Sequence, residues 1–210
     1  MIYKNVKLGK NTLLDEPVII GKPPRGRADG ELETIIGDDS VIRAFTVIYA
    51  GTRIGRNFQT GHGAMIREDN IIGDRCSVGT NAVLEYGNRI GNGTRVHTGC
   101  FLENVTLGDN VFVGPNVVFT DDPHPPCPRY SECVGGPVVG SNVRIGANST
   151  ILPGVRIGDN SLIGAGSVVV EDIPKNSVAY GCPAKVVKKV SDLKCKKKFY
   201  KKPYEWVKDV

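Results

Sequence analysis

Three histidines are the clearest candidates for acid–base chemistry in this chain: His62, His97 and His124. Imidazole exchanges a proton near neutral pH more readily than other side chains do. A base of this kind serves group transfer to an amine or a hydroxyl, because the attacking atom must lose its proton, while N–H donors stabilise the oxyanion that develops. We therefore looked for the structural elements that would position these residues.

Charged residues also recur at a fixed spacing of eighteen. They form two adjacent series, namely Arg67, Glu85 and Glu103, and beside them Glu68, Tyr86 and Asn104. Stacked carboxylates repel each other unless a cation lies between them, so Arg67 or the ammonium group of a ligand must balance this charge. The series is consistent both with a structural ladder and with an ammonium-binding site.

A six-residue repeat positions all of these groups. Every sixth residue from Ile36 to Leu102 is Ile, Val or Leu, with Thr60 as the one exception. After a step of five residues, from Leu102 to Leu107, and one interruption, the repeat continues to Val169. This period fits neither an α-helix nor a long strand, so it describes a repeated unit of architecture.

Three hexads form one coil, because the pattern of an apolar residue followed by Gly recurs every eighteen residues, as at Ile54 and Ile72. We expect short parallel strands on the three sides of a prism, with Gly or Asn at the corners and coils spaced about 4.8 Å apart. Residues eighteen apart then become vertical neighbours. His62 falls in the column of Thr98 with His97 one place away, so the two histidines lie about 10 Å apart on one wall.

Two long insertions interrupt the prism and are candidate functional segments, because they are not needed for the stacking. Residues 21–34 contain Lys22, Arg25 and Arg27, which suit either a phosphate-binding loop or an ordinary exposed loop.

The second insertion, residues 121–138, contains His124, Cys127 and Cys133. Their spacing matches no usual zinc motif and leaves a metal site incomplete, so we predict a structural loop and no metal. The step of five residues before Leu107 predicts a bulge-like irregularity that re-aims side chains next to Glu103.

Length and composition predict one domain, the repeat-built prism over residues 1–174, followed by a basic tail over residues 175–210. The net charge is +5, but residues 185–210 contribute +7, which leaves −2 for the rest. Such a tail is most often a solvated face and otherwise suits an anionic partner; no motif indicates nucleic acid. Without an apolar leader or membrane-length segment, and with scattered cysteines, the chain is expected to be cytoplasmic and not membrane-bound.

The sequence Gly181-Cys-Pro-Ala-Lys185, placed directly after the last coil, resembles the terminal signature of the hexapeptide-repeat acyltransferases. The resemblance implies an all-β fold, a left-handed parallel β-helix of about seven to eight coils, which forms a homotrimer. We expect a short, helical C-terminal tail after it.

The segment VHTGCFLENVTLGDNVFVGPNVVFTDD, residues 96–122, is similar to the nucleotide-linked aminosugar N-acetyltransferases of that family. This implies an acetyl-CoA-dependent N-acetyltransferase in which the amine of a nucleotide-linked amino sugar attacks the thioester directly. In those enzymes polar residues near the position of Thr98 face the sugar amine, and an Asn commonly stands where Asp121 stands here.

The resemblance and the columns together define the expected site. The catalytic candidates are His62, which matches the family's third-position histidine, and Glu103. The expected substrate-binding residues are Arg67, Glu85, His97, Thr98, Asn104 and Asp121. The expected cofactor-binding residues are Gly146, Ala147, Gly164, Ala165, Lys185 and Lys188.

Three other functions were compared with this hypothesis. An O-acetyltransferase acting on a sugar or another small hydroxyl compound is barely distinguishable from it by sequence. A non-catalytic β-helix scaffold is disfavoured by His62 and the terminal signature. A β-helix carbonic anhydrase needs three converging histidines, which His124 in its loop does not allow.

Overall fold

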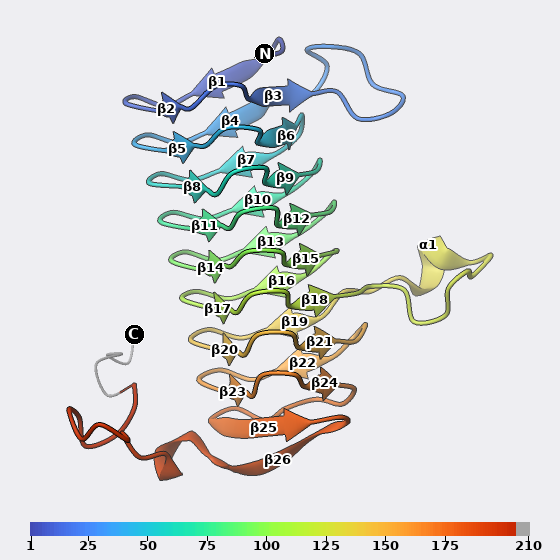
Figure 1. Cartoon of the computed structure of the whole chain (residues 1–210). Coiled ribbons are helices and arrows are strands. Elements are labelled where there is room, and N and C mark those ends of the chain that lie inside the picture. Colours follow the sequence, from blue (N-terminus) through green and yellow to red (C-terminus); the bar gives the residue numbers. More distant parts are fainter. Residues whose placement is uncertain (205–210) are drawn as a thin grey trace.

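Stacked flat coils form a three-sided prism in the computed structural model, which describes residues 1–204 (Figure 1). The fold is a left-handed parallel β-helix, as predicted. Two of its three faces carry eight strands each, so the chain has eight coils, within the predicted range. Residues 205–210, the last six of the predicted basic tail, lie outside the described residues.

In every coil the chain runs along the first, second and third face in turn. The first face consists of β1 (Val6–Leu8), β4 (Thr34–Ile36), β7 (Arg53–Ile54), β10 (Ile71–Ile72), β13 (Arg89–Ile90), β16 (Thr106–Leu107), β19 (Val138–Val139) and β22 (Arg156–Ile157). The second consists of β2 (Leu13–Leu14), β5 (Val41–Ile42), β8 (Gln59–Thr60), β11 (Ser77–Val78), β14 (Arg95–Val96), β17 (Phe112–Val113), β20 (Arg144–Ile145), β23 (Leu162–Ile163), β25 (Ser177–Gly181) and β26 (Ala184–Lys189). The third consists of β3 (Ile19–Lys22), β6 (Val47–Tyr49), β9 (Met65–Ile66), β12 (Val83–Leu84), β15 (Phe101–Leu102), β18 (Val118–Phe119), β21 (Thr150–Ile151) and β24 (Val168–Val169).

The register of the strands confirms the predicted columns. Ile72 pairs with Ile54 on one side and with Ile90 on the other, each eighteen residues away. These leading residues are at most 5% exposed and form the core of the prism. Asn residues hold positive φ at many corners, among them Asn81 and Asn148, as the sequence predicts. The repeat is therefore a direct map of the structure.

The step of five residues is absorbed at one corner without a bulge. Ile90 pairs with Leu107 and Arg89 with Thr106, so the register changes to seventeen in regular pairing. The Oδ1 atom of Asn88 accepts a 2.9 Å hydrogen bond from the backbone N–H of Val105, which fills the shortened corner. The predicted bulge-like irregularity is wrong, because a missing corner residue shortens a turn and leaves the flanking strands unchanged.

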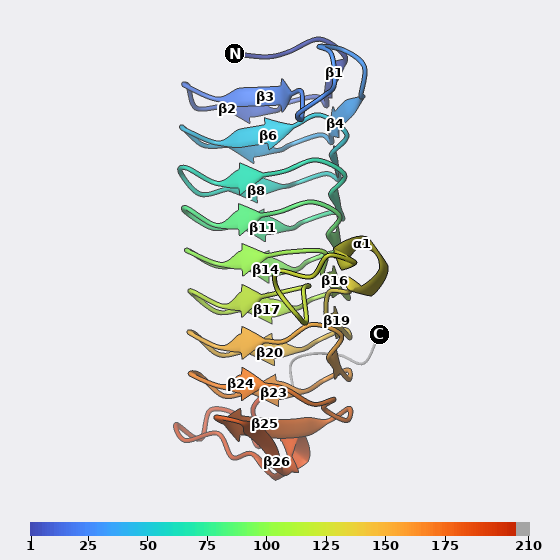
Figure 2. The same cartoon turned by 90° about the vertical axis from the view of Figure 1, so that its right-hand side faces the viewer.

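Both insertions leave the prism at the same corner, between the third face and the first face of the next coil. The first follows β3 and the second follows β18, and both project to the right in Figure 1. The second contains α1 (Tyr130–Cys133), which Figure 2 shows in front of the stack. We call this corner, which runs down the stack of coils past Lys22 at one level and Asp121 at another, the insertion edge.

Over residues 175–204 the tail forms a β-hairpin and one 3-10 turn, not the predicted short helical tail. β25 continues the second face in parallel with β23, and β26 pairs with β25 in an antiparallel hairpin. One 3-10 turn, η1 (Val190–Asp192), follows. The open edge of β23 offers backbone partners, and the β-branched pair Val186-Val187 favours a strand. Neither α1 nor η1, the helices found in residues 1–204, has the length or apolarity to cross a bilayer.

Candidate active site

The charged column predicted from the sequence lies on the insertion edge. Arg67 bonds Glu85 at 2.8 Å and forms a two-pronged pair with Glu68 at 2.7 and 2.8 Å. The hydrogen bond with Glu68 raises the pKa of Arg67. The ring of Tyr49 lies between two cations, with Arg67 Cζ at 5.3 Å and Lys22 Nζ at 5.4 Å from its centroid. The sequence left two cations that could balance this charge, Arg67 and the ammonium group of a ligand. In the structure Arg67 pairs with Glu85.

Below this pair, Asp121 is a buried carboxylate. It is 1% exposed, and its Oδ2 atom accepts hydrogen bonds of 3.1 Å from the hydroxyls of Tyr86 and Tyr130. The two hydroxyls also contact each other. Burial raises the pKa of both tyrosines, so they remain neutral donors. The Oδ1 atom of Asp121 has no hydrogen-bond partner among the described residues.

Glu103 is the second carboxyl group near Asp121 on this edge. Burial and, after it, the negative charge of Asp121 raise the pKa of Glu103 to about 7, with smaller contributions from Glu85 and Asp122. A protonated Glu103 donates to a carboxylate, whereas an ionised Glu103 repels it. Glu103 and Asp121 therefore form a carboxyl pair in which Glu103 exchanges its proton near neutral pH.

Buried asparagines keep this edge rigid. Asn88 is fully buried, and its Nδ2 atom donates to Asn70 Oδ1 at 2.8 Å and to the carbonyl of Glu85 at 2.7 Å. Asn70 Nδ2 in turn donates to the carbonyls of Arg67 and Glu85. These hydrogen bonds give the backbone carbonyls of Arg67 and Glu85 their partners. They therefore fix the backbone from which the charged side chains extend.

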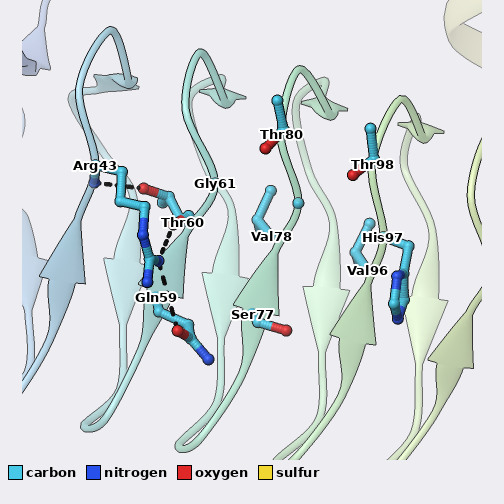
Figure 3. Close-up of a pocket in the computed structure, with 11 residues that line it drawn as sticks. Arg43, Gln59, Thr60, Gly61, Ser77, Val78, Thr80, Val96, His97 and Thr98 are labelled. Atoms are coloured by element: carbon cyan, nitrogen blue, oxygen red, sulfur yellow. Dashed lines mark hydrogen bonds between the residues drawn. The ribbon is translucent and has the colours of Figure 1, made fainter.

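A second candidate region is a polar groove of about 230 Å³ on the second face, shown in Figure 3. Its lining residues come from four successive coils: Arg43, Gln59, Thr60, Gly61, Ser77, Val78, Gly79, Thr80, Val96, His97 and Thr98. The His97 ring packs against Phe112 with 4.7 Å between centroids. The predicted substrate residues His97 and Thr98 thus line one groove.

Thr60, the exception in the repeat, has a structural role in this groove. Its Oγ1 accepts the backbone N–H of Arg43 at 2.9 Å and lies 3.0 Å from Thr46 Oγ1. The Arg43 guanidinium in turn donates to the carbonyl of Thr60 (Figure 3). Side-chain bonds therefore replace a backbone ladder bond here, and only Val41 and Gln59 pair between β5 and β8.

The histidines and the carboxylates lie at different corners of the prism. His62 and His97 follow β8 and β14, two coils apart, at the corner between the second and third faces. Glu103 follows β15 on the insertion edge, so the width of the third face separates it from His62. His62 is exposed, and its imidazole makes no hydrogen bond within residues 1–204. One chain therefore does not bring the two expected catalytic residues together.

The expected cofactor residues share the histidine corner. Gly146 and Ala147 follow β20, and Gly164 and Ala165 follow β23, so both pairs continue the column of His97. A Cβ on Gly146 would lie 2.3 Å from the backbone nitrogen of Ala165, and one on Gly164 would lie 2.7 Å from Tyr180 Cβ. The stacking of the coils by itself explains why these positions are glycine.

Below them, an apolar pocket of about 350 Å³ is lined by Phe112, Arg144, Ile145, Gly146, Leu162 and Tyr204. The Arg144 guanidinium stacks on Tyr204 with 4.0 Å between Cζ and the ring centroid. Lys185 lies on β26 and pairs with Glu171 at 2.9 Å, and Lys188 is exposed on the same strand.

The three potential metal ligands of the second insertion do not form a metal site. Within residues 1–204 no cluster of three or more His, Cys, Asp or Glu side chains suits a metal ion. The segment instead returns to the prism through Tyr130, which reaches Asp121, and through the 2.9 Å bond from Gly135 N–H to the Asp121 carbonyl. The base of the loop is therefore held to the prism by hydrogen bonds to Asp121.

Sequence reasoning missed Tyr130, Arg43 and the pocket at Tyr204. Tyr130 lies in an insertion outside the repeat, so its column position is undefined. Arg43 occupies a regular corner, and nothing in its spacing marks it. Tyr86 was visible in the column next to Glu85, but its bond to Asp121 spans two coils and depends on side-chain length.

Comparison with family models places the repeat among known transferases. The model "Bacterial transferase hexapeptide (six repeats)" matches residues 136–170, and the model "Hexapeptide repeat of succinyl-transferase" matches residues 70–104. Both segments fall within the coils and flank the second insertion, so the repeat on either side of the carboxyl pair is of the transferase type.

Curated relatives and a solved structure agree with this. Galactoside O-acetyltransferase of Escherichia coli is 40% identical over 145 residues, which cover 62% of this chain and 70% of that protein. Its namesake from Lactococcus lactis is 38% identical over 139 residues, or 58% of this chain and 63% of that protein. The crystal structure of the polySia-specific acetyltransferase NeuO, at 21% identity, has the same fold, with a TM-score of 0.54 over 90% of this chain and 79% of that one.

Proposed function

The chain belongs to the hexapeptide-repeat acyltransferase family, and from this premise we propose that it transfers an acetyl group from acetyl-CoA to the amino group of a nucleotide-linked sugar. The observation that carries the choice of acceptor is the carboxyl pair Glu103–Asp121. A buried carboxylate with one orphaned oxygen attracts a cationic or proton-donating group, and a sugar amine arrives as such a group.

The proposed reaction needs a proton acceptor and a polar cradle. When acetyl-CoA is bound, it supplies a thioester whose carbonyl carbon accepts the amine nitrogen, so that the C–S bond breaks and the sulfur takes a proton. Glu103, with a pKa of about 7, accepts a proton from the incoming ammonium, and His62 accepts the second proton as the C–N bond forms. Arg67 holds Glu85 in place, and Asn104 lies next to Glu103 on the same edge.

This assignment requires a homotrimer, because His62 and Glu103 lie at different corners of one chain. We place the site between chains, where the histidine corner of one protomer meets the insertion edge of its neighbour. His97 and Thr98 then contribute the groove wall, and Gly146, Ala147, Gly164 and Ala165 the backbone strip along which the cofactor lies. Arg144 and the exposed Lys188 suit its phosphates, as does Lys185 after it leaves Glu171.

The nucleotide is assigned to the first insertion. Lys22, Arg25 and Arg27 lie on the same edge as Glu103, and Lys22 is four coil steps, or about 19 Å, away from it. Arg27 already pairs with Glu31 at 2.5 Å, whereas Arg25 is exposed. A phosphate group of an extended, nucleotide-linked substrate is expected to contact Lys22 or Arg25.

O-acetylation of a sugar hydroxyl is the second candidate, and the names of the Escherichia coli and Lactococcus lactis relatives favour it. A hydroxyl carries no charge, so the carboxyl pair would then act only as a proton acceptor. The two candidates differ in one property: only an amine acceptor gains from the negative charge of the pair.

The test is to incubate the purified chain with acetyl-CoA and UDP-, dTDP- and GDP-linked amino sugars, each beside its hydroxyl counterpart and a free galactoside. Release of thiol and the product mass are measured. Thiol release with an amino sugar alone supports the proposal, release with hydroxyl sugars alone supports O-acetylation, and none with any acceptor overturns both. His62→Ala and Glu103→Gln should each lower kcat at least about 100-fold, whereas His124→Ala in the loop serves as the control.

A further inference from the structure

The second insertion contains two cysteines that the proposed function does not use. Cys127 and Cys133 are free thiols whose Sγ atoms lie 3.5 Å apart. Cys133 is exposed and Cys127 is half-buried, so small molecules reach both. A disulfide requires about 2.0 Å between the sulfurs, so the two Sγ atoms must approach by about 1.5 Å to form one.

A local turn brings these cysteines together. The carbonyl of Cys127 accepts the backbone N–H of Tyr130 at 3.1 Å, and α1 begins there and ends at Cys133. The carbonyl of Tyr130 accepts Val134 N–H at 2.8 Å. The pairing of the thiols is therefore a property of the folded turn and does not depend on the prism.

The other four cysteines have different surroundings. Cys76 and Cys100 are buried, and their thiols donate to the carbonyls of Gly91 at 3.0 Å and Gly114 at 3.1 Å. Both side chains are enclosed in the core, so a small disulfide does not reach them. Cys182 and Cys195 have no cysteine beside them in the described part of the chain.

We propose that Cys127 and Cys133 are a reversible disulfide site, and that the bond holds α1, and with it Tyr130, against Asp121. Tyr130 lies between the two cysteines in the sequence, and its hydroxyl donates to Asp121 Oδ2 at 3.1 Å. Closing the segment 127–133 removes much of the freedom by which Tyr130 leaves that contact. The redox state of the two cysteines thereby controls how firmly Tyr130 is held against Asp121 on the insertion edge.

The chemistry is thiol–disulfide exchange with a small disulfide such as oxidised glutathione. One cysteine thiolate attacks the small disulfide, forming a mixed disulfide and releasing one thiolate. The second cysteine attacks the mixed disulfide, forms the intramolecular bond and releases the other. Two electrons pass from the protein to the small disulfide, and the two thiol protons appear on the released thiols.

The first experiment counts thiols in the denatured full-length chain before and after treatment with oxidised glutathione. In a Cys182→Ser/Cys195→Ser background, which lacks the two cysteines outside the loop that small molecules can reach, four cysteines remain, and the count should fall from four to two. The mass should fall by two hydrogen atoms, and reductant should reverse both changes. Adding Cys127→Ser to this background should instead give a glutathione adduct. A constant count, or a loss that persists in Cys127→Ser without an adduct, overturns the site.

The second experiment measures amide hydrogen exchange over residues 128–134. In the oxidised protein, exchange should slow about tenfold, because the closed segment opens less often. Tyr130→Phe should reduce this protection without changing the thiol count, since it removes only the contact with Asp121. Equal exchange in the two redox states overturns the link to Tyr130. Neither measurement depends on the acetyltransferase reaction.

Discussion

The chemistry proposed for the insertion edge depends on the proton of Glu103, which lies near Asp121. Glu103 ordinarily has a pKa of 4.5, and burial beside Asp121 raises it to about 7. The two tyrosine hydroxyls donate to Oδ2 of Asp121, and its Oδ1 has no hydrogen-bond partner among the described residues. The arrangement keeps a proton donor in the site below about pH 7 and a proton acceptor above it.

Replacing Glu103 by Gln should change how stability depends on pH. Between about pH 4.5 and about pH 7 the folded protein retains a proton that the unfolded chain has lost, so the wild type loses stability as pH rises through this window. The Glu103→Gln variant has no carboxyl group at this position, so its stability does not fall in this way as the pH rises. It should be more stable than the wild type above pH 7, by about 1 kcal/mol after allowance for solvent screening.

Urea unfolding at several pH values measures this difference. The control is Glu171→Gln, which removes an exposed carboxylate outside the carboxyl pair. The free energy of unfolding of this variant should show the same pH dependence as that of the wild type. Parallel curves for the wild type and Glu103→Gln would show that Glu103 is not held in its protonated form.

The coil is the element that sets most positions in this protein, and its tight stacking explains the repeated glycines. Gly146 has no room for a side chain, because a Cβ would lie 2.3 Å from the nitrogen and 2.6 Å from the Cα of Ala165. Gly166 differs, since a Cβ there would meet nothing within 4 Å, although its φ is +69°.

These two glycines form a matched pair for a stability measurement. Gly146→Ala should cost about 3 kcal/mol, because the backbone of the next coil must move. Gly166→Ala should cost about 1 kcal/mol, the strain of a left-handed conformation alone. Chemical unfolding followed by circular dichroism gives both values, and equal costs would contradict the stacking argument.

The second insertion is an element that the prism does not need. Strands β16 and β19 pair across it, and Gly135 N–H closes its base on the Asp121 carbonyl. Replacing residues 122–134 by Gly-Gly should therefore keep the β-helix, with a change in Tm of no more than about 4 °C. Activity should be lost, because Tyr130 is removed.

The matched control deletes one hexad, residues 142–147, from within the stack. This deletion moves every later strand to the preceding face, so the variant should misfold. Circular dichroism and thermal melting distinguish the two deletions, and unfolding of both would show that the loop supports the prism.

The assembly of the whole molecule decides whether the proposed site exists. Light scattering should give three times the chain mass of 22.6 kDa. In a ring of three chains every interface joins two different corners of the prism. Mixing the inactive variants His62→Ala and Glu103→Gln should then restore activity at about one quarter of the sites, since these receive one intact residue from each chain.

Activity of co-refolded variants, compared with each variant refolded alone, measures this complementation. Co-refolding either variant with itself is the control for the procedure. A mixture no more active than its components would place His62 and Glu103 in separate roles, and a monomeric mass would remove the site between chains.

The regular part of the fold follows from the amino-acid pattern, because each coil repeats the same local geometry. Branched residues at Ile54, Ile72 and Ile90 turn inward, small or left-handed residues make the corners, and a spacing of eighteen becomes a vertical contact. Two further features are predictable from this pattern. They are the column of Arg67, Glu85 and Glu103, and the burial of Cys76 and Cys100.

The features that the pattern does not contain are contacts made where the repeat stops. The return of Tyr130 to Asp121 depends on the path of an irregular loop, and the bonds of Thr60 depend on side-chain rotamers. The β-hairpin of the tail depends on the open edge of β23. Above all, columns relate residues eighteen apart but do not tell which faces of different chains meet, so the separation of His62 from Glu103 became visible only when the corners were placed in three dimensions.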